Sequence, residues 1–303
     1  MTFSARVKNE LCKESRLFDA HSLFLLYGIL LFSRNFKLSE MSFHTENENI
    51  SELVYELLVQ NFGCAVDVEF SGTDKKENII LKISKECDRK AILTRFGHLK
   101  KDEINLKINK ELLKTQEDVK IFLKGVFITC GTVTDPQNGY HLEFCVPYMN
   151  LSKCLFEVLT SLKNVQLKVK STTRKGVFVI YIKDSSDITD FLAYIGAPLC
   201  AMDFMQIKMV KEVRNYVNRT TNFEAANISK IAAAATAQIA AIKNIKKSGK
   251  FNCLSDDLKE LANLRIANPE MSLRELGKNL SIPLTRSGVN HKMKKLLSIS
   301  KHI

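Results

Sequence analysis

The strongest constraint on the fold of this chain is an internal duplication with a period of 99 residues. Residues 82–97 read KISKECDRKAILTRFG, and residues 181–196 read YIKDSSDITDFLAYIG. Each segment overlaps the end of a run rich in β-branched and aromatic residues, ENIILKI in the first and GVFVIYI in the second, which predicts a strand. Each then predicts a short helix that ends at a glycine, Gly97 or Gly196. One structural unit is therefore encoded twice.

The correspondence extends upstream of these segments. Residues 23–38 (LFLLYGILLFSRNFKL) match residues 119–134 (VKIFLKGVFITCGTVT), and both predict an apolar helix followed by a strand. Each copy continues with a second helix, ISELVYELLVQNFG or NLSKCLFEVLTSLK, and a strand, CAVDVEF or VQLKVKS. A glycine inside an apolar helix costs about 1 kcal/mol relative to alanine and usually has a packing reason. We expect the helices of Gly28 and Gly125 to pack against each other about a pseudo-twofold axis.

This layout resembles the two-copy LAGLIDADG homing endonuclease fold. The resemblance implies an α+β domain over residues 1–200, with copies at about 20–100 and 117–200 and two saddle-shaped sheets beside the central helices. It also implies an acid near the end of each central helix that holds the catalytic Mg²⁺. Counting from the motif glycines, these positions hold Ser33 and Cys130 in this chain. These are degenerate nuclease positions.

Neither residue can replace the missing carboxylates. Mg²⁺ binds hard oxygen ligands, and two-metal phosphodiester cleavage needs carboxylates to hold the ions. Asp135 lies nearby, but it precedes Pro136 in a predicted turn. The eight cysteines and six histidines show no zinc-ligand spacing. The sequence therefore predicts a retained scaffold without catalytic residues, metal or cofactor.

Positive charge is concentrated in the last third of the chain. Residues 1–205 contain 27 Lys or Arg and 26 Asp or Glu, whereas residues 206–303 contain 18 and 7. This asymmetry is typical of a polyanion-binding module, because cations that neutralise phosphates release condensed counterions. The alternative is a basic surface that serves solubility alone.

Residues 201–250 predict a helical linker. Its alanine-rich part, 232–235 with neighbouring isoleucines, is typical of a helix packed closely against a protein neighbour. A connector between domains is the favoured interpretation. The other is a helix beside DNA whose Arg214, Arg219 and Lys230 contact phosphates.

Residues 251–303 predict three short helices. Ser255 is expected to cap the first, Ser272 and Glu275 form a capping box at the second, and Thr285 is expected to cap the third. Val289, Met293 and the leucines at 296 and 297 form the apolar side of the third helix. This arrangement is typical of an all-α helix-turn-helix unit, whose last helix enters the major groove of DNA.

The polar side of this unit supplies the predicted contacts to DNA. Arg286 is expected to read guanine and Asn290 adenine, with lysines near phosphates. The predicted set is Ser272, Arg274, Thr285, Arg286, Ser287, Asn290, His291, Lys292, Lys294 and Lys295. The alternative is a three-helix cap whose polar side meets only water. The turn over 282–289 is longer than in compact helix-turn-helix units, which would shift the register in the groove.

The combination of the two parts resembles the WhiA family of sporulation regulators and probable cell division proteins. The most specific stretches are NRTTNFEAANISK at 218–230 and NPEMSLRELGKNLSIPLTRSGVNHKMKKL at 268–296. The resemblance implies a non-enzymatic, sequence-specific DNA-binding transcription regulator with a role in cell division and chromosome segregation.

Two other functions stay open beside this one. The first is a scaffold whose N-terminal domain recruits a protein partner in division or regulation, and the second, less favoured, is an active endonuclease. The saddle could still contact DNA through Lys168, Lys170, Arg174 and Lys175. The chain shows no secretory signal and no apolar run of bilayer length, so we expect a cytoplasmic, nucleoid-associated protein whose partner is double-stranded DNA and not a membrane.

Overall fold

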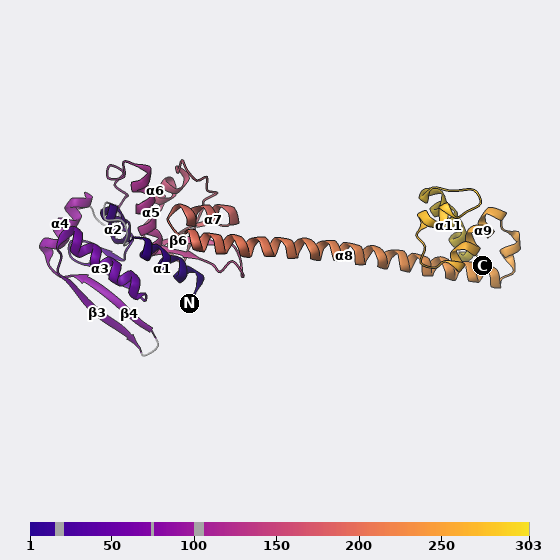
Figure 1. Ribbon diagram of the computed structural model, residues 1–303, viewed down its shortest axis with the longest axis horizontal. Helices are drawn as coiled ribbons and strands as arrows, with labels where there is room; N and C mark the ends of the chain where they lie inside the picture. The colour runs from indigo at the N-terminus through magenta and orange to yellow at the C-terminus, as the bar shows by residue number, and fades with distance from the viewer. Residues whose placement is uncertain (16–20, 74–75, 100–105, 303) are drawn as a thin grey trace. The chain divides into compact units, whose positions relative to one another are not determined.

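The computed structural model describes residues 1–15, 21–73, 76–99 and 106–302. Its contacts divide the chain into two compact units, Met1–Lys211 and Glu212–Ile303. Each unit has its own hydrophobic core, and the two are described separately here (Figure 1).

The N-terminal unit begins with helix α1 (Phe3–Ser15) and then contains the predicted duplication. The first copy consists of α2 (Ser22–Leu31), β1 (Asn35–Phe36), β2 (Met41–Thr45), α3 (Glu48–Phe62), β3 (Val66–Thr73), β4 (Lys76–Ile83) and α4 (Glu86–Phe96). The second consists of α5 (Gln116–Cys130), β5 (Gly131–Val133), β6 (Leu142–Val146), α6 (Met149–Thr160), β7 (Lys170–Arg174), β8 (Val177–Ile182) and α7 (Ser185–Tyr194). The duplicated order of helices and strands is confirmed.

Each copy forms an antiparallel four-stranded sheet of the same topology. The strand orders are β1-β2-β4-β3 and β5-β6-β8-β7. In the first sheet, Phe43 and Leu81 are paired and buried on the helix-covered face, while Ser42 and Lys82 pair on the other face. In the second sheet, Phe144 lies opposite Ile180 on the covered face. The alternation of apolar and polar positions thus gives each sheet one free face.

One predicted strand was placed too early in the chain. The run VQLKVKS at 165–171 predicts a strand, but β7 begins only at Lys170. The amide of Lys168 donates to the Asp187 carboxylate (2.7 Å), so this part of the backbone is bound to α7 and not to the β8 ladder. A side-chain acceptor in a neighbouring helix has replaced the strand partner.

The central helices α2 and α5 meet at their glycines, as the sequence predicts. A Cβ built on Gly28 would lie 2.3 Å from the Phe122 carbonyl oxygen, and one on Gly125 would lie 2.3 Å from that of Leu25. The Thr129 hydroxyl also donates to the Ile29 carbonyl (3.2 Å) across the pair. The symmetric contacts confirm the expected close approach about a pseudo-twofold axis.

Helix α1 joins this core to the start of the long helix α8 (Pro198–Lys247). Both carboxylate oxygens of Glu10 accept from the amides of Leu199 and Cys200 (2.7 and 2.9 Å). These are unpaired donors of the first turn of α8, where a carboxylate also interacts favourably with the helix dipole. Phe3 packs against Phe204 at 6.0 Å between ring centroids.

By length and hydropathy alone, α8 is the one helix among the described residues that could span a membrane, and 22% of its most apolar 18-residue window is buried. The expected absence of a transmembrane segment stays a prediction. The alanine-rich part of α8 is buried on one side, at Ala235, Ala241 and Ile242.

Candidate nucleic-acid interface

The C-terminal unit is a three-helix cluster built on the end of α8. After the 3-10 turn Lys250–Cys253 come α9 (Asp256–Ala267), α10 (Leu273–Lys278) and α11 (Arg286–Lys301). Their buried core is Ile242, Ile245, Leu254, Leu258, Leu261, Ala262, Leu276, Leu280, Val289, Met293 and Leu296. The apolar stripe predicted for α11 is confirmed at 289, 293 and 296, with Leu297 only half-buried.

Helix α10 starts at the predicted capping box. The Ser272 hydroxyl accepts from the Glu275 amide (3.3 Å), and the Glu275 carboxylate accepts from the Ser272 amide (2.8 Å). Gly277 allows the following turn to cross α10, since a Cβ there would lie 2.3 Å from the Leu284 carbonyl oxygen. The Leu284 amide in turn donates to the Gly277 carbonyl (2.9 Å). A residue with a side chain at 277 would push α10 and the turn apart.

The turn between α10 and α11 is fixed from α9. It spans 279–285, longer than the three or four residues of a compact helix-turn-helix turn. The Glu260 carboxylate accepts from the amide and hydroxyl of Ser281 (2.6 and 2.7 Å), and these bonds lower the pKa of Glu260. The turn therefore has a defined conformation despite its length.

Buried Arg265 holds the loop between α9 and α10. Its guanidinium donates to the carbonyl oxygens of Asn268, Pro269 and Met271 (3.5, 3.3 and 2.7 Å). Burial lowers the pKa of Arg265 from its ordinary value. Its role in the structure is to satisfy loop carbonyls, and sequence analysis missed both Arg265 and Glu260, because nothing in their spacing marks them.

The predicted caps differ in outcome. The Thr285 hydroxyl accepts from the Gly288 amide (3.3 Å) at the start of α11, as expected. Ser255 occupies the N-cap position of α9, but its side chain does not cap the helix. The cap prediction for Ser255 was wrong: its side chain makes no hydrogen bond to the amides of the first turn, and it instead interacts with Asp257 and contributes to the lowered pKa of that carboxylate.

Helix α11 presents a polar face without any carboxylate. Its sequence, RSGVNHKMKKLLSISK, contains no Asp or Glu. Ser287, Asn290, His291 and Lys294 are exposed and follow i, i+3, i+4, i+7 spacing, so they share the side opposite the buried stripe. Arg286 is exposed at the first turn. This face combines hydrogen-bonding groups for base edges with cations for phosphates.

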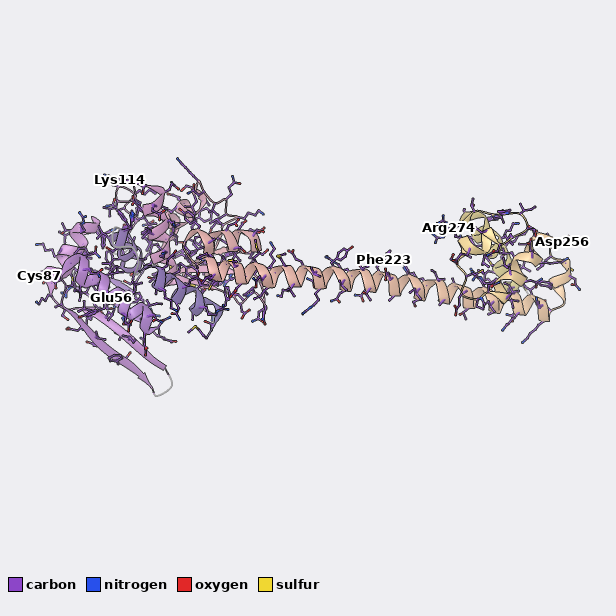
Figure 2. The ribbon with its side chains drawn as sticks, viewed as in Figure 1. Glu56, Cys87, Lys114, Phe223, Asp256 and Arg274 are labelled. Carbon is purple, nitrogen blue, oxygen red and sulfur yellow. The ribbon has the colours of Figure 1, made fainter. Side chains whose placement is uncertain are left out.

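The other predicted DNA-contacting residues lie around this face in different environments. Arg274 is exposed on α10 (Figure 2), and Lys295 is exposed on α11. Lys292 is turned toward α9, where its ammonium lies 2.5 Å from the Asp257 carboxylate. The Lys292 interaction is the largest cause that lowers the pKa of Asp257 to about 2. Lys292 thus has a structural partner within the unit, whereas Lys294 forms no ion pair with the residues that the structure describes.

The two degenerate nuclease positions lie at the ends of the central helices. The buried Ser33 hydroxyl donates to the Leu30 carbonyl (2.7 Å), and the Cys130 thiol donates to the Val126 carbonyl (3.4 Å). Burial raises the pKa of Cys130 to about 12, so it is a neutral thiol. The described residues contain no group of three or more His, Cys, Asp or Glu side chains that could hold a metal ion.

A lysine lies beside this position, which sequence analysis did not identify. Burial lowers the pKa of Lys8 on α1, and Lys8 and Cys130 are close enough to influence each other's pKa. The two residues are 122 positions apart, so no local pattern connects them. At the position where the LAGLIDADG resemblance predicts an acid, the chain therefore has a thiol whose pKa is influenced by a nearby amine.

The second saddle sheet does not carry four free cations on one face. Lys170 and Arg174 lie on its free face, opposite Tyr181 and Val177. Arg174 is paired with Glu143 (3.2 Å), and Lys168 is paired with Asp184 (2.9 Å). Lys175 occupies the β7–β8 turn with φ 48°. Two of the four predicted cations, Lys168 and Arg174, are therefore paired with carboxylates.

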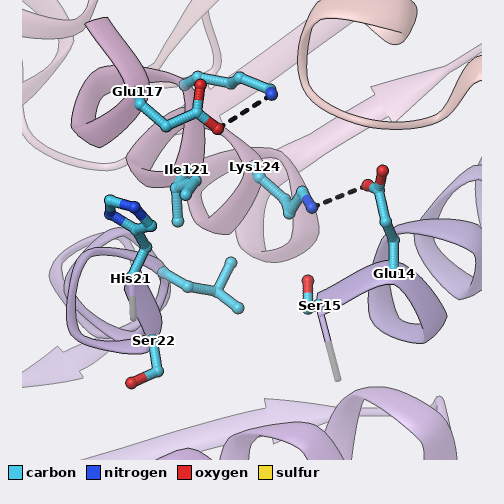
Figure 3. A pocket seen from close by; sticks show the side chains of 9 residues that line it. Glu14, Ser15, His21, Ser22, Glu117, Ile121 and Lys124 are labelled. Atoms are coloured by element: carbon cyan, nitrogen blue, oxygen red, sulfur yellow. Dashed lines mark hydrogen bonds and ion pairs between the residues drawn. The ribbon is translucent and has the colours of Figure 1, made fainter. Parts of the chain in front are cut away.

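A cavity of about 270 Å³ lies near the starts of α2 and α5 (Figure 3). It is lined by His21, Ser22 and Leu25 on one side and by residues of α1 and α5 on the other. Lys124 pairs with Glu14 (2.9 Å), and Lys120 pairs with Glu117 (3.0 Å). Both lysines that line the cavity are thus paired with carboxylates, and the cavity does not have the free positive charge that an anion-binding site needs.

Comparisons with known proteins agree with this two-part architecture. Residues 119–214 match the family described as WhiA LAGLIDADG-like domain, and residues 217–300 match the WhiA C-terminal HTH domain. Two relatives called "Probable cell division protein WhiA" are 33% identical in Clostridium botulinum (strain Hall / ATCC 3502 / NCTC 13319 / Type A) and 34% identical in Clostridium novyi (strain NT). The alignments cover 100% of this chain and 99% and 98% of the relatives.

A solved structure shows the same fold over the whole chain. The crystal structure of full-length DUF199/WhiA from Thermatoga maritima matches with a TM-score of 0.60 and 24% identity, covering 100% of this chain and 99% of that one. The N-terminal unit is thus LAGLIDADG-like and the C-terminal unit a helix-turn-helix domain. With relatives one-third identical over its full length, this chain belongs to the WhiA family.

Proposed function

We propose that this chain is a non-enzymatic, sequence-specific DNA-binding regulator that inserts α11 into the major groove of duplex DNA. The observation that carries the proposal is the exposed face of α11, which combines Asn290, His291 and Lys294 without a carboxylate. A helix that reads DNA needs such a face, because each carboxylate near a phosphate would oppose binding.

The residues of this face have separable roles. Arg286 and Asn290 are placed in the first turns of α11, the part of a recognition helix that contacts base edges. Lys294 lies one turn further and is suited to a phosphate. Ser272 and Thr285 act chiefly as helix caps that fix the positions of α10 and α11, although hydroxyl and backbone groups there could also contact phosphates. Ser287, Arg274 and Lys295 complete the proposed contact surface.

The proposal divides the chain into functional parts. Residues 1–200 form the scaffold, 201–250 the linker and 251–303 the DNA-binding domain. Because two relatives carry the name "Probable cell division protein WhiA", we extend a role in cell division and chromosome segregation to this chain. Its place of action would then be the nucleoid in the cytoplasm.

The proposed lack of nuclease activity is supported by the central helices. A catalytic Mg²⁺ needs carboxylate ligands, whereas Ser33 is neutral and the raised pKa of Cys130 keeps its thiol protonated. The amine of Lys8 beside Cys130 would further disfavour a divalent cation. Supercoiled plasmid incubated with the full chain and Mg²⁺ or Mn²⁺ should stay uncut.

Binding by full-length variants tests the DNA-reading role. A selected high-affinity duplex and a scrambled duplex are compared by fluorescence anisotropy at several salt concentrations. Arg286→Ala and Asn290→Ala should each weaken binding to the selected duplex by about 1–3 kcal/mol, roughly 5- to 150-fold, with a much smaller effect on the scrambled one. Lys294→Ala should weaken both and reduce the salt slope by about 1.

Lys259→Ala is the matched control. Lys259 is a cation of the same unit, but it lies on α9 and not on α11, and it pairs with Asp256 (3.3 Å). If Lys259→Ala weakened binding as much as Lys294→Ala, net charge and not the α11 face would control affinity. If Arg286→Ala and Asn290→Ala affected both duplexes equally, α11 would not read sequence.

A further inference from the structure

Helix α8 carries a row of large apolar side chains that face solvent. Met202, Met209 and Tyr216 are 59%, 59% and 67% exposed. Figure 2 shows Phe223, which is 68% exposed, projecting from the same helix. We name as the α8 apolar face the residues Leu199, Met202, Met205, Met209, Val210, Val213, Tyr216, Val217, Phe223, Ile228 and Ile231. Amphipathic helices normally bury such a face.

These residues lie on one side of the helix. At 100° per residue, all eleven fall within an arc of roughly 140°, and the run from Leu199 to Ile231 is about 48 Å long. The opposite side of the first turns is already in use: Phe204 is buried, and Lys208 and Lys211 donate to Ser186 and to the Pro136 carbonyl (2.9 and 2.8 Å). The helix is therefore docked through its other side, and the apolar face is turned outward.

We propose that the α8 apolar face is a self-association surface on which α8 of a second copy packs in antiparallel orientation. An apolar stripe of this length needs a partner of equal length and similar chemistry, and a second α8 provides both. Two copies related by a twofold axis place the same face against itself, the commonest arrangement of soluble homo-oligomers. The proposal does not depend on whether the chain binds DNA.

The charges along the stripe favour the antiparallel orientation. Glu224 lies within the apolar arc, so a parallel, in-register pair would place the two Glu224 carboxylates against each other. An antiparallel pair separates them. Glu212 and Arg219 lie seven residues apart along the same edge of the arc. If two antiparallel helices cross midway between these positions, Glu212 of each copy lies beside Arg219 of the other. Complementary charges at such edges set orientation in helix pairs.

The same charges argue against a lipid surface as the occupant. An amphipathic helix on a membrane buries its apolar side at the headgroup boundary and keeps charges on the other side. Here Glu224 would be pushed into that boundary, and Lys208 and Lys211 are already bonded to the N-terminal unit instead of being free for anionic lipids.

The test measures the mass of the full chain by sedimentation equilibrium under reducing conditions, from low to tens of micromolar. The wild type should pass from 34.4 kDa to twice that mass. Met209→Glu combined with Tyr216→Glu should weaken self-association by about 100-fold or more, because two central apolar contacts become charges. The matched control is Asn215→Glu combined with Asn222→Glu, which adds the same charges at the same spacing on the opposite, exposed side.

Orientation is tested by exchanging charges. Glu212→Arg should weaken self-association, and adding Arg219→Glu should restore it, because the two residues meet only between copies. Circular dichroism confirms that each variant keeps its helix content. A wild type that stays at 34.4 kDa, or equal behaviour of the two glutamate pairs, would overturn the proposal. So would a monomer that binds phosphatidylglycerol vesicles through Met209 and Tyr216, because the face would then serve a membrane.

Discussion

Replacing Gly28 with alanine should destabilise the N-terminal unit through the contact between α2 and α5. The new Cβ would lie 2.3 Å from the Phe122 carbonyl oxygen and 3.0 Å from the Val126 amide nitrogen. Both are backbone atoms of a helix, so the clash cannot be relieved by rotating a side chain. The two helices must instead separate by roughly 1 Å. A gap of this size removes a quarter to half of the van der Waals attraction of each contact between them. Overpacking of this kind costs about 1–3 kcal/mol.

Alanine also offsets part of this cost, because it is a better helix former than glycine by about 1 kcal/mol. Taking the upper end of the overpacking cost, we expect a net loss of about 2 kcal/mol, which lowers the unfolding temperature of a unit of this size by about 4–8 °C. The chain has no tryptophan, and six of its seven tyrosines lie in residues 1–211, so tyrosine fluorescence follows this unit selectively.

Gly139→Ala provides the matched control, since a Cβ at Gly139 would meet no atom within 4 Å. The double variant Gly28→Ala with Gly125→Ala should lose less stability than the sum of the two single variants, because one separation of the helices relieves both clashes. If Gly28→Ala unfolded at the same temperature as Gly139→Ala, α2 and α5 would not be in backbone contact, and the reasoning would fail.

Four further outcomes follow from individual contacts. Gly277→Ala should destabilise the C-terminal unit by about 1–3 kcal/mol, with the tyrosine-monitored transition unchanged. Arg265→Ala should cost a similar amount by leaving loop carbonyls unsatisfied, measured by urea unfolding of the same unit. Since the pKa of folded Asp257 is lowered to about 2, its pairing with Lys292 stabilises the unit above pH 4 and is lost as pH falls toward 2; Asp257→Asn should flatten this part of the stability profile. With its pKa raised to about 12, Cys130 should resist iodoacetamide at pH 8 until urea unfolds the chain, as mass spectrometry can show.

The duplicated scaffold could be predicted from sequence because its signals are local and occur twice. Glycines after apolar runs mark helix ends, and Gly63 and Gly97 do adopt the left-handed conformation that ends α3 and α4. The capping box at Ser272 likewise depends only on residues three apart. Such features follow from short-range backbone chemistry, which a sequence displays directly.

The errors arose where another side chain, near or far in the sequence, competes for a local donor or acceptor. Asp187 takes the amide of Lys168 and delays the start of β7, and Asp257 takes the hydroxyl that Ser255 would use as a cap. The predicted DNA-contacting set includes Lys292 for the same reason: its sequence position does not reveal that its ammonium pairs with Asp257 on α9. Spacing along one helix cannot show which neighbour another element will present.

The surroundings of Cys130 show that its neutral thiol is only part of what disfavours a divalent cation there. Ser33 and Cys130 supply no carboxylate ligand for a divalent cation, although water and neighbouring acids are also oxygen ligands for such ions. Helix α1 brings the amine of Lys8 close enough to Cys130 for the two groups to influence each other's pKa, and burial lowers the pKa of the amine and raises that of the thiol. A carboxylate introduced at 130 would raise the pKa of the Lys8 amine and favour its protonated form, and the resulting ion pair would offset the negative charge that Mg²⁺ needs. Acids introduced at 33 and 130 alone should therefore not create a metal site, because the Lys8 amine of α1 would compete with the metal ion for their negative charge.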